Sequence, residues 1–224
     1  MTETQMGGKS VWSWQHGNQP VRNVIIILGG ENLRTSLPEH MTGVGCEHSF
    51  VLIGFSSIDW NRELTPWAAP GLRKDEPFLG HGRELLDWML EELLPFICER
   101  YANAAISIMG YSLGGLMALW CCYETDVFSG CASCSGSLWY DSWLEYAATH
   151  HFRRETATYL SLGESEEKAR NQRLARVGDA TRQMAMLMEH DPSVSRCVLC
   201  FHPGGHFNDP EGRMAEAARW LIEQ

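Results

Sequence analysis

The stretch MGYSLGG, residues 109–115, places one serine between glycines where an apolar run ends and a helical pattern begins. Residues 104–109 (AAISIM) are apolar enough for a buried strand, and residues 113–124 (LGGLMALWCCYE) have a helical composition. The pattern G-x-S-x-G, centred on Ser112, is typical of a strand-to-helix turn that exposes a nucleophilic serine. Because so short a pattern also arises by chance, its weight depends on the surrounding sequence.

Glycine is expected on either side of Ser112 for a steric reason. A sharp turn strains the backbone of the serine and brings strand and helix so close that side chains at Gly110 and Gly114 would clash. The serine hydroxyl then stands clear of the sheet, beside a helix N-terminus whose free N–H groups and partial positive charge can stabilise an oxyanion. The local sequence therefore favours a nucleophile at Ser112 over a plain corner between two elements.

Strand and helix patterns alternate along the chain. Short apolar runs predict strands near residue 11 and at 23–28, 50–55, 104–109, 127–134, 156–162 and 195–201. Helical patterns cover residues 82–101, 113–124, 167–190 and 210–224. Most later strands are apolar throughout, which implies burial on both faces. We therefore expect an α/β fold with a mostly parallel central sheet covered by helices on both faces, in a single domain over residues 1–224.

Composition and charge exclude several classes of partner. The chain has 224 residues, 44% of them hydrophobic, and a formal net charge of −10, which suits a soluble globular protein and argues against binding nucleic acid. The N-terminus lacks the pattern of a secretory signal, and no apolar run approaches the ~20 residues that span a bilayer. We expect a cytoplasmic protein without a membrane or nucleic-acid partner, and nothing in the sequence indicates its oligomeric state.

A serine nucleophile needs a general base, and the chain offers nine histidines. His206 follows the last predicted strand in the segment HPGGHF, on a glycine-flanked loop at the same sheet edge as Ser112. His202 is nearby but closer to the strand. Loop position and chain order favour His206 as the base.

The acid that orients the histidine should lie between Ser112 and His206, because this order is characteristic of the fold. The segment GESEE, residues 163–167, follows the penultimate predicted strand and contains three glutamates. We choose Glu166, with Glu164 and Glu167 as alternatives, since some of these residues can simply favour the dipole of the next helix. A dyad without an acid is a further alternative.

The eight cysteines are expected to be reduced and mostly packed. Two C-x-x-C spacings, Cys131/Cys134 and Cys197/Cys200, have the ligand spacing of a zinc site. Both pairs fall in or beside predicted strands, where residues three apart point to opposite faces and cannot readily chelate one ion. We therefore expect neither a metal nor a cofactor.

Several further stretches resemble the putative-esterase family of α/β-hydrolases, which includes siderophore esterases, feruloyl esterases and esterase D-like enzymes. They are VIIILGGEN (24–32), RELTPW (62–67), FLGHGRELLDWMLEELLPFI (78–97) and SGSLWYD (135–141). With GYSLGG, GESEE and GGHF they cover residues 20–220 in the family's order. The sequence departs from the family in lacking an acidic residue in the turn at 28–30 and in offering Glu rather than the commoner Asp as the acid.

The resemblance implies an α/β-hydrolase fold and a serine esterase that cleaves a small-molecule carboxylic ester through an acyl-enzyme. The expected oxyanion donors are the N–H of Leu113 and a second N–H, from Gly30 or Glu31, after an early strand. Trp139 is expected to line the substrate pocket, with Trp60, Trp67 and Trp143 as weaker candidates. Arg62 is expected to bind a substrate carboxylate or catechol oxygen, or else to make a structural ion pair.

Other functions remain open at the level of sequence. The same three residues can transfer an acyl group to an alcohol or sugar, or cleave an amide, as an acyltransferase or amidase. A relative that binds small molecules without catalysis is a second alternative, and a metal-thiolate module built on the cysteine pairs is a third.

Overall fold

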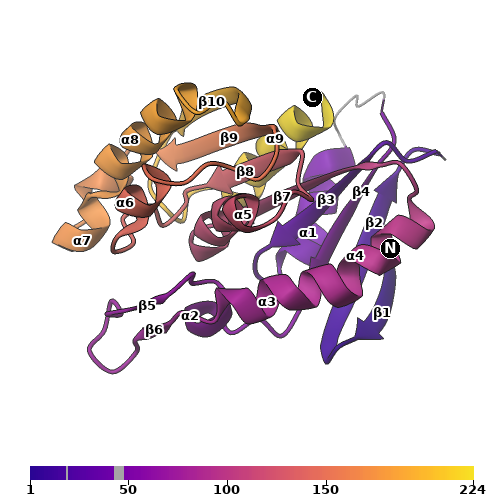
Figure 1. The fold of residues 1–224 in the computed structure, drawn as a ribbon, viewed down its shortest axis with the longest axis horizontal. Helices are drawn as coiled ribbons and strands as arrows, with labels where there is room; N and C mark the ends of the chain where they lie inside the picture. Colours follow the sequence, from indigo (N-terminus) through magenta and orange to yellow (C-terminus); the bar gives the residue numbers. More distant parts are fainter. Residues whose placement is uncertain (19, 43–47) are drawn as a thin grey trace.

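The computed structural model describes residues 1–224 except residues 19 and 43–47, and its main feature is a twisted central sheet (Figure 1). The strands β1 and β2, and β2 and β4, pair antiparallel, and all the later neighbours pair parallel. In spatial order the strands are β1 (Thr2–Met6), β2 (Lys9–His16), β4 (Phe50–Phe55), β3 (Asn23–Leu28), β7 (Ala105–Tyr111), β8 (Gly130–Cys134), β9 (Thr156–Gly163) and β10 (Val194–His202). The predicted mostly parallel sheet is confirmed.

Helices cover both faces of this sheet, as the sequence predicts (Figure 1). One face packs against α3 (Gly82–Trp88), the π-helical turn η1 (Met89–Leu93), α4 (Leu94–Arg100), α5 (Leu113–Glu124), α6 (Trp143–Ala147) and α8 (Val177–Glu189). The other face packs against α1 (Leu33–Thr42) and α9 (Pro210–Ile222). The two apolar layers explain why the central strands are apolar throughout.

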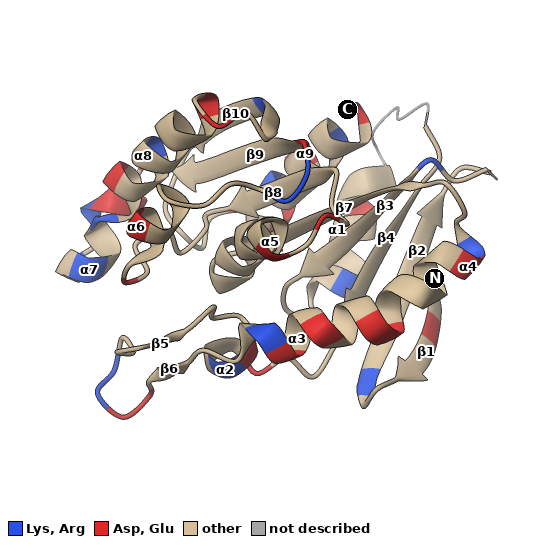
Figure 2. Ribbon diagram, in the orientation of Figure 1, with Lys and Arg blue, Asp and Glu red and all other residues tan. Residues whose placement is uncertain are grey.

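The central strands contain no charged residue, and Figure 2 shows the charges on helices, loops and the sheet's outer strands. Side chains of β3 and β4 point alternately into the two layers, so that Ile26 packs in one core and Ile25 in the other. Within the described ranges, no helix combines the length and apolar character needed to cross a membrane.

A short hairpin extends beyond the main sheet at one end (Figure 1). It consists of β5 (Ala68–Ala69) and β6 (Phe78–Leu79), which pair antiparallel with each other, and it follows the short helix α2 (Trp60–Glu63). The backbone packs closely where the hairpin leaves the rest of the structure, because a Cβ on Gly80, at φ +75°, would lie 2.1 Å from the backbone of Trp67 and Ala68.

Two predicted elements differ from the structure. The helix predicted over 167–190 is broken into the 3₁₀ turn η2 (Glu166–Lys168), α7 (Gln172–Ala175) and α8. The break occurs because Asn171 caps a new helix, its Oδ1 accepting hydrogen bonds from the N–H groups of Arg173 (2.9 Å) and Leu174 (3.4 Å). The strand predicted to start at residue 127 starts at Gly130.

Candidate active site

Ser112 occupies the sharp turn between β7 and the first residue of α5. Its backbone has φ 58° and ψ −120°, a conformation that costs free energy for any residue with a side chain. A Cβ on Gly110 would lie 2.3 Å from the carbonyl carbon and oxygen of Gly114, and one on Gly114 would lie 2.2 Å from the carbonyl oxygen of Leu28. Both glycines are therefore required by the close packing of β7, α5 and β3.

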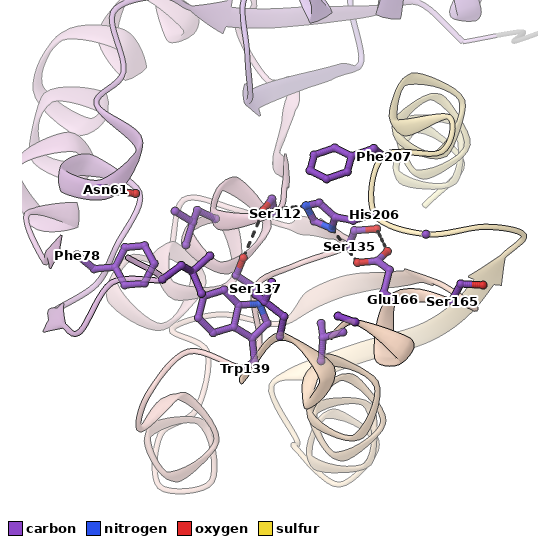
Figure 3. Close-up of a pocket in the computed structure, with 16 residues that line it drawn as sticks. Asn61, Phe78, Ser112, Ser135, Ser137, Trp139, Ser165, Glu166, His206 and Phe207 are labelled. Carbon is purple, nitrogen blue, oxygen red and sulfur yellow. Dashed lines mark hydrogen bonds and ion pairs between the residues drawn. The ribbon is translucent and has the colours of Figure 1, made fainter. Parts of the chain in front are cut away.

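His206 lies on the loop between β10 and α9, and its Nε2 is 3.2 Å from the Ser112 Oγ (Figure 3). The loop is anchored from below, because the Tyr111 hydroxyl donates a hydrogen bond of 2.6 Å to the carbonyl oxygen of His206. Burial raises the pKa of Tyr111, so its hydroxyl stays protonated and able to donate. The imidazole therefore has a fixed place beside the serine.

Glu166 completes a hydrogen-bonded chain of three side chains (Figure 3). Its Oε2 accepts a hydrogen bond of 2.7 Å from Nδ1 of His206, and its Oε1 accepts bonds from the Ser135 hydroxyl (2.6 Å) and the Gly163 N–H (2.8 Å). Burial on its own raises the pKa of this carboxyl, but the hydrogen bonds from His206, Ser135 and Gly163 outweigh it and hold the pKa below its usual value. Glu166 is thus an ionised carboxylate beneath the imidazole.

The two alternative glutamates point elsewhere. Glu167 makes an ion pair of 2.8 Å with Arg182 of α8, and Glu164 is exposed to solvent. Of the three glutamates predicted from sequence, the structure brings only Glu166 to His206. The reason is the 3₁₀ turn η2, whose first residue faces the sheet edge while its second faces α8.

Arg213, which no sequence motif marks as a site residue, supports this arrangement from α9. Its side chain is 2% exposed, and its Nη1 donates to Glu166 Oε1 (3.2 Å) and to the Ser135 hydroxyl (3.0 Å). Its Nη2 donates to the carbonyl oxygens of Pro203 (3.3 Å) and Gly205 (3.0 Å), in the loop that carries His206. One buried guanidinium therefore ties the carboxylate and the histidine loop together.

The predicted oxyanion donors lie at the same sheet edge. β3 and β7 are neighbours with Leu28 opposite Gly110, so the segment that holds Gly30 and Glu31 follows β3 just as Ser112 follows β7. Among the residues that the structure describes, the N–H groups of Leu113, Gly30 and Glu31 donate to no protein acceptor. Leu113 is among the described residues that line the cavity over Ser112, whereas Gly30 and Glu31 are not.

A cavity of about 460 Å³ opens over Ser112 (Figure 3). Its floor holds the polar groups of Ser112, Ser137, His206 and Glu166, and most of its wall is apolar. The apolar wall includes Leu72, Phe78, Trp139, Leu174, Val177 and Phe207. The volume falls in the range of small-molecule sites.

Of the other residues predicted to touch a ligand, the structure brings Trp139 into the cavity wall but not Arg62. The Arg62 guanidinium pairs with Glu84 at 2.8 Å on the surface, which corresponds to the structural alternative. Trp67 and Trp143 stack on each other, with ring centroids 6.3 Å apart, and Trp60 is on the surface. None of these three tryptophans is among the described residues that line the cavity.

The cysteine pairs point to opposite faces of the sheet. Cys131 packs in one apolar layer and Cys134 in the other, and Cys197 and Cys200 divide in the same way. Within the part of the chain that the structure describes, which omits Cys46, there is no group of three or more His, Cys, Asp or Glu residues that could hold a metal ion. Strand geometry is the reason, because residues three apart alternate in direction.

Comparisons with known proteins agree with this fold. The model of the family described as "Putative esterase" matches residues 18–206. An IroE-like serine hydrolase from Shewanella oneidensis superposes with a TM-score of 0.81 at 16% identity, over 96% of this chain and 76% of that one. The siderophore hydrolase EstB from Aspergillus nidulans superposes with a TM-score of 0.74 at 15% identity, over 96% of this chain and 90% of that one. No curated protein sequence matches this chain.

Proposed function

Because the chain belongs to the family described as "Putative esterase", we propose that it is a serine hydrolase that cleaves carboxylic esters through an acyl-enzyme. The observation that carries the proposal is the chain of hydrogen bonds from Ser112 through His206 to Glu166, at the floor of a cavity. Structural neighbours support it, since one is described as a serine hydrolase and others as siderophore hydrolases.

In the first half-reaction Ser112 Oγ attacks the ester carbonyl carbon while His206 Nε2 removes the hydroxyl proton. The tetrahedral intermediate collapses when His206 returns that proton to the leaving alcohol oxygen, and the acyl group stays on Ser112. In the second half-reaction a water molecule attacks the acyl carbon while His206 Nε2 removes its proton. The second tetrahedral intermediate collapses when His206 returns this proton to Ser112 Oγ, which breaks the bond to the serine and releases the carboxylic acid. The buried carboxylate of Glu166 fixes the imidazole and stabilises its protonated form.

The negative charge on the carbonyl oxygen needs donors that are already in place. The N–H of Leu113, at the start of α5, is one donor, and the N–H of Gly30 or Glu31 is the second. The N-terminal end of α5 adds its partial positive charge. Loss of one such donor typically raises the barrier by roughly 3 kcal/mol.

The test is pre-steady-state hydrolysis of p-nitrophenyl acetate. We expect a burst of p-nitrophenol with an amplitude near one per protein molecule, and no turnover by Ser112→Ala. Ser129→Ala is the matched control, because its hydroxyl bonds to the carbonyl oxygen of Ile106 near the opposite end of β7. Turnover by Ser112→Ala equal to that of the Ser129→Ala protein, or no hydrolysis of any activated ester by the wild-type protein, would overturn the proposal.

A further inference from the structure

Aromatic rings line the cavity on two sides of Ser112 (Figure 3). Phe78 and Trp139 lie on one side of Ser112, with ring centroids 6.1 Å apart. Phe207 lies on the other side, with its ring centroid 5.1 Å from that of His206. The reacting serine is therefore placed between two apolar surfaces.

We propose that these two surfaces are separate subsites, with the alcohol part of the ester against Phe207 and the acyl part against Phe78 and Trp139. The substrate class that follows is an uncharged ester with an apolar group on each side of its carbonyl. This inference rests on the proposed function.

Phe207 differs from the buried rings of Phe78 and Trp139, because it lines the cavity and yet is 91% exposed. A phenyl ring so exposed gains nothing from the protein core, and it can bury apolar surface only when a ligand covers it. Its ring makes an edge-to-face contact with the ring of His206, with 87° between the two planes. Its position fits contact with a substrate better than a role in packing.

The chemistry of proton transfer fixes which part of the ester lies beside Phe207. His206 Nε2 must come within hydrogen-bond distance of the alcohol oxygen to protonate it as it leaves. The alcohol carbon chain therefore leaves the reaction centre on the side of His206 and Phe207. The acyl chain, on the other bond of the carbonyl carbon, is directed toward Phe78 and Trp139.

The acyl side is a rigid aromatic wall. Phe78 and Trp139 are 4% and 8% exposed, and the guanidinium of Arg173 lies 5.8 and 5.0 Å from their ring centroids. Its Nη1 donates to the carbonyl oxygens of Pro70 and Gly71, and its Nη2 lies 3.1 Å from a carboxylate oxygen of Asp141, so the positive charge is paired although Nε and Nη2 make no hydrogen bond with a described residue. Arg173 fixes the wall and is not itself among the cavity-lining residues that the structure describes.

The charge of the cavity argues against anionic substrates. Among its described lining residues there is no Lys or Arg, and Arg62 pairs with Glu84 on the surface. A carboxylate or catecholate entering this cavity would lose its hydration without gaining a cation. The same wall accepts uncharged alkyl and aryl groups without that cost.

The first experiment varies the alcohol at constant acyl group, with ethyl acetate and benzyl acetate as substrates. We expect Phe207→Ala to lower the ratio of kcat/KM for benzyl acetate to that for ethyl acetate about tenfold. Phe201→Ala is the matched control, because Phe201 is also an exposed phenylalanine (40%) but lies on β10 under the guanidinium of Arg182. An unchanged ratio in Phe207→Ala overturns the alcohol subsite.

The second experiment varies the acyl group, with p-nitrophenyl esters of acetate, phenylacetate, butyrate and hydrogen succinate. We expect Trp139→Leu to lower the preference for phenylacetyl over acetyl about tenfold, with Trp139→Phe restoring most of it. Thermal unfolding checks that both variants fold. The wild-type protein should prefer butyrate over the anionic hydrogen succinate by at least about tenfold. Equal rates for these two esters overturn the exclusion of anions.

Deacylation separates the two subsites, because the alcohol has already left and only the acyl group remains bound. Phe207→Ala should leave the ratio of the deacylation rate constants of the phenylacetyl-enzyme and the acetyl-enzyme unchanged, and Trp139→Leu should change it. The opposite pattern overturns the assignment of sides. If the wild-type protein shows Ser112-dependent hydrolysis but no such selectivity, only this inference fails, whereas no hydrolysis at all overturns the proposed function itself.

Discussion

At the scale of single residues, the site depends on a carboxylate that is buried yet ionised. Glu166 has a side chain 4% exposed, and it keeps its charge because both carboxylate oxygens accept hydrogen bonds, Oε2 from His206 and Oε1 from Ser135, Gly163 and Arg213. A buried carboxylate stays ionised only while these donors surround it. Single substitutions of Glu166 or of its donors therefore test its role.

Glu166→Gln should lower kcat for p-nitrophenyl acetate by about 100-fold or more, because an amide can neither hold the imidazole in the same tautomer nor stabilise its protonated form. Glu164→Gln and Glu167→Gln, which alter an exposed residue and a surface ion pair, should leave kcat within about twofold. The three variants compare the same chemical change at neighbouring positions. A larger loss at residue 164 or 167 than at 166 would contradict the assignment of the acid.

Arg213→Met should lower the free energy of unfolding by about 3 kcal/mol, measured by urea denaturation, because it leaves the Glu166 carboxylate buried without its cation. Arg182→Met is the control, since it removes the partly exposed pair with Glu167 and should cost about 0.5 kcal/mol. An equally small loss of unfolding free energy in both variants would mean that Arg213 contributes packing but no charge compensation for Glu166.

At the scale of elements, the strands that carry the site could be predicted and several flanking elements could not. The runs at 104–109, 156–162 and 195–201 are short, rich in apolar and β-branched residues and bounded by turn residues, which marks them as strands. β1 has the polar sequence TETQM and forms because it pairs with β2 at the sheet edge, which no local pattern reveals. α1 contains Pro38, a residue that normally argues against a helix interior.

The same division applies to the site. Ser112 and His206 could be predicted because each follows a parallel strand, and parallel strands end at one edge. Glu166 could be narrowed only to three candidates, since the sequence does not show which side of a 3₁₀ turn faces the sheet. Arg213 reads as an ordinary charged position of a helix, and only the tertiary structure shows that it is buried.

The close packing of β7, α5 and β3 gives a prediction at this scale. Gly114→Ala should lower the free energy of unfolding by about 3 kcal/mol, because its Cβ would lie 2.2 Å from the backbone oxygen of Leu28. The folding control is Gly205→Ala, where the nearest described atom is 3.7 Å away. Chemical denaturation of both variants makes the comparison, and equal stability would show that the turn can relax.

At the scale of the whole molecule, the net charge of −10 acts on every substrate that approaches. Figure 2 shows most charged residues on helices, loops and outer strands, and among the described residues that line the cavity Glu166 is the only Asp, Glu, Lys or Arg. A neutral ester meets no long-range force, whereas an anionic ester is repelled before it reaches the cavity. The negative net charge and the cavity wall, which has no Lys or Arg among its described residues, therefore both favour neutral esters over anionic ones.

Ionic strength separates the long-range effect from the local one. Raising NaCl from about 10 to 150 mM should increase kcat/KM for p-nitrophenyl hydrogen succinate about threefold, because salt screens the repulsion. The neutral p-nitrophenyl butyrate should change by less than about 1.3-fold under the same conditions. A parallel response of the two esters would show that net charge does not steer substrates.

The hairpin of β5 and β6 affects how the substrate preference of this protein can evolve. It supplies Phe78 and, in its connecting loop, Leu72 to the cavity, yet its strands pair only with each other. Insertions or exchanges between residues 70 and 77 can therefore alter which acyl groups fit while the edge that carries Ser112 keeps its geometry. The acyl preference can therefore change through this hairpin without any change in the segments that carry Ser112, His206 and Glu166.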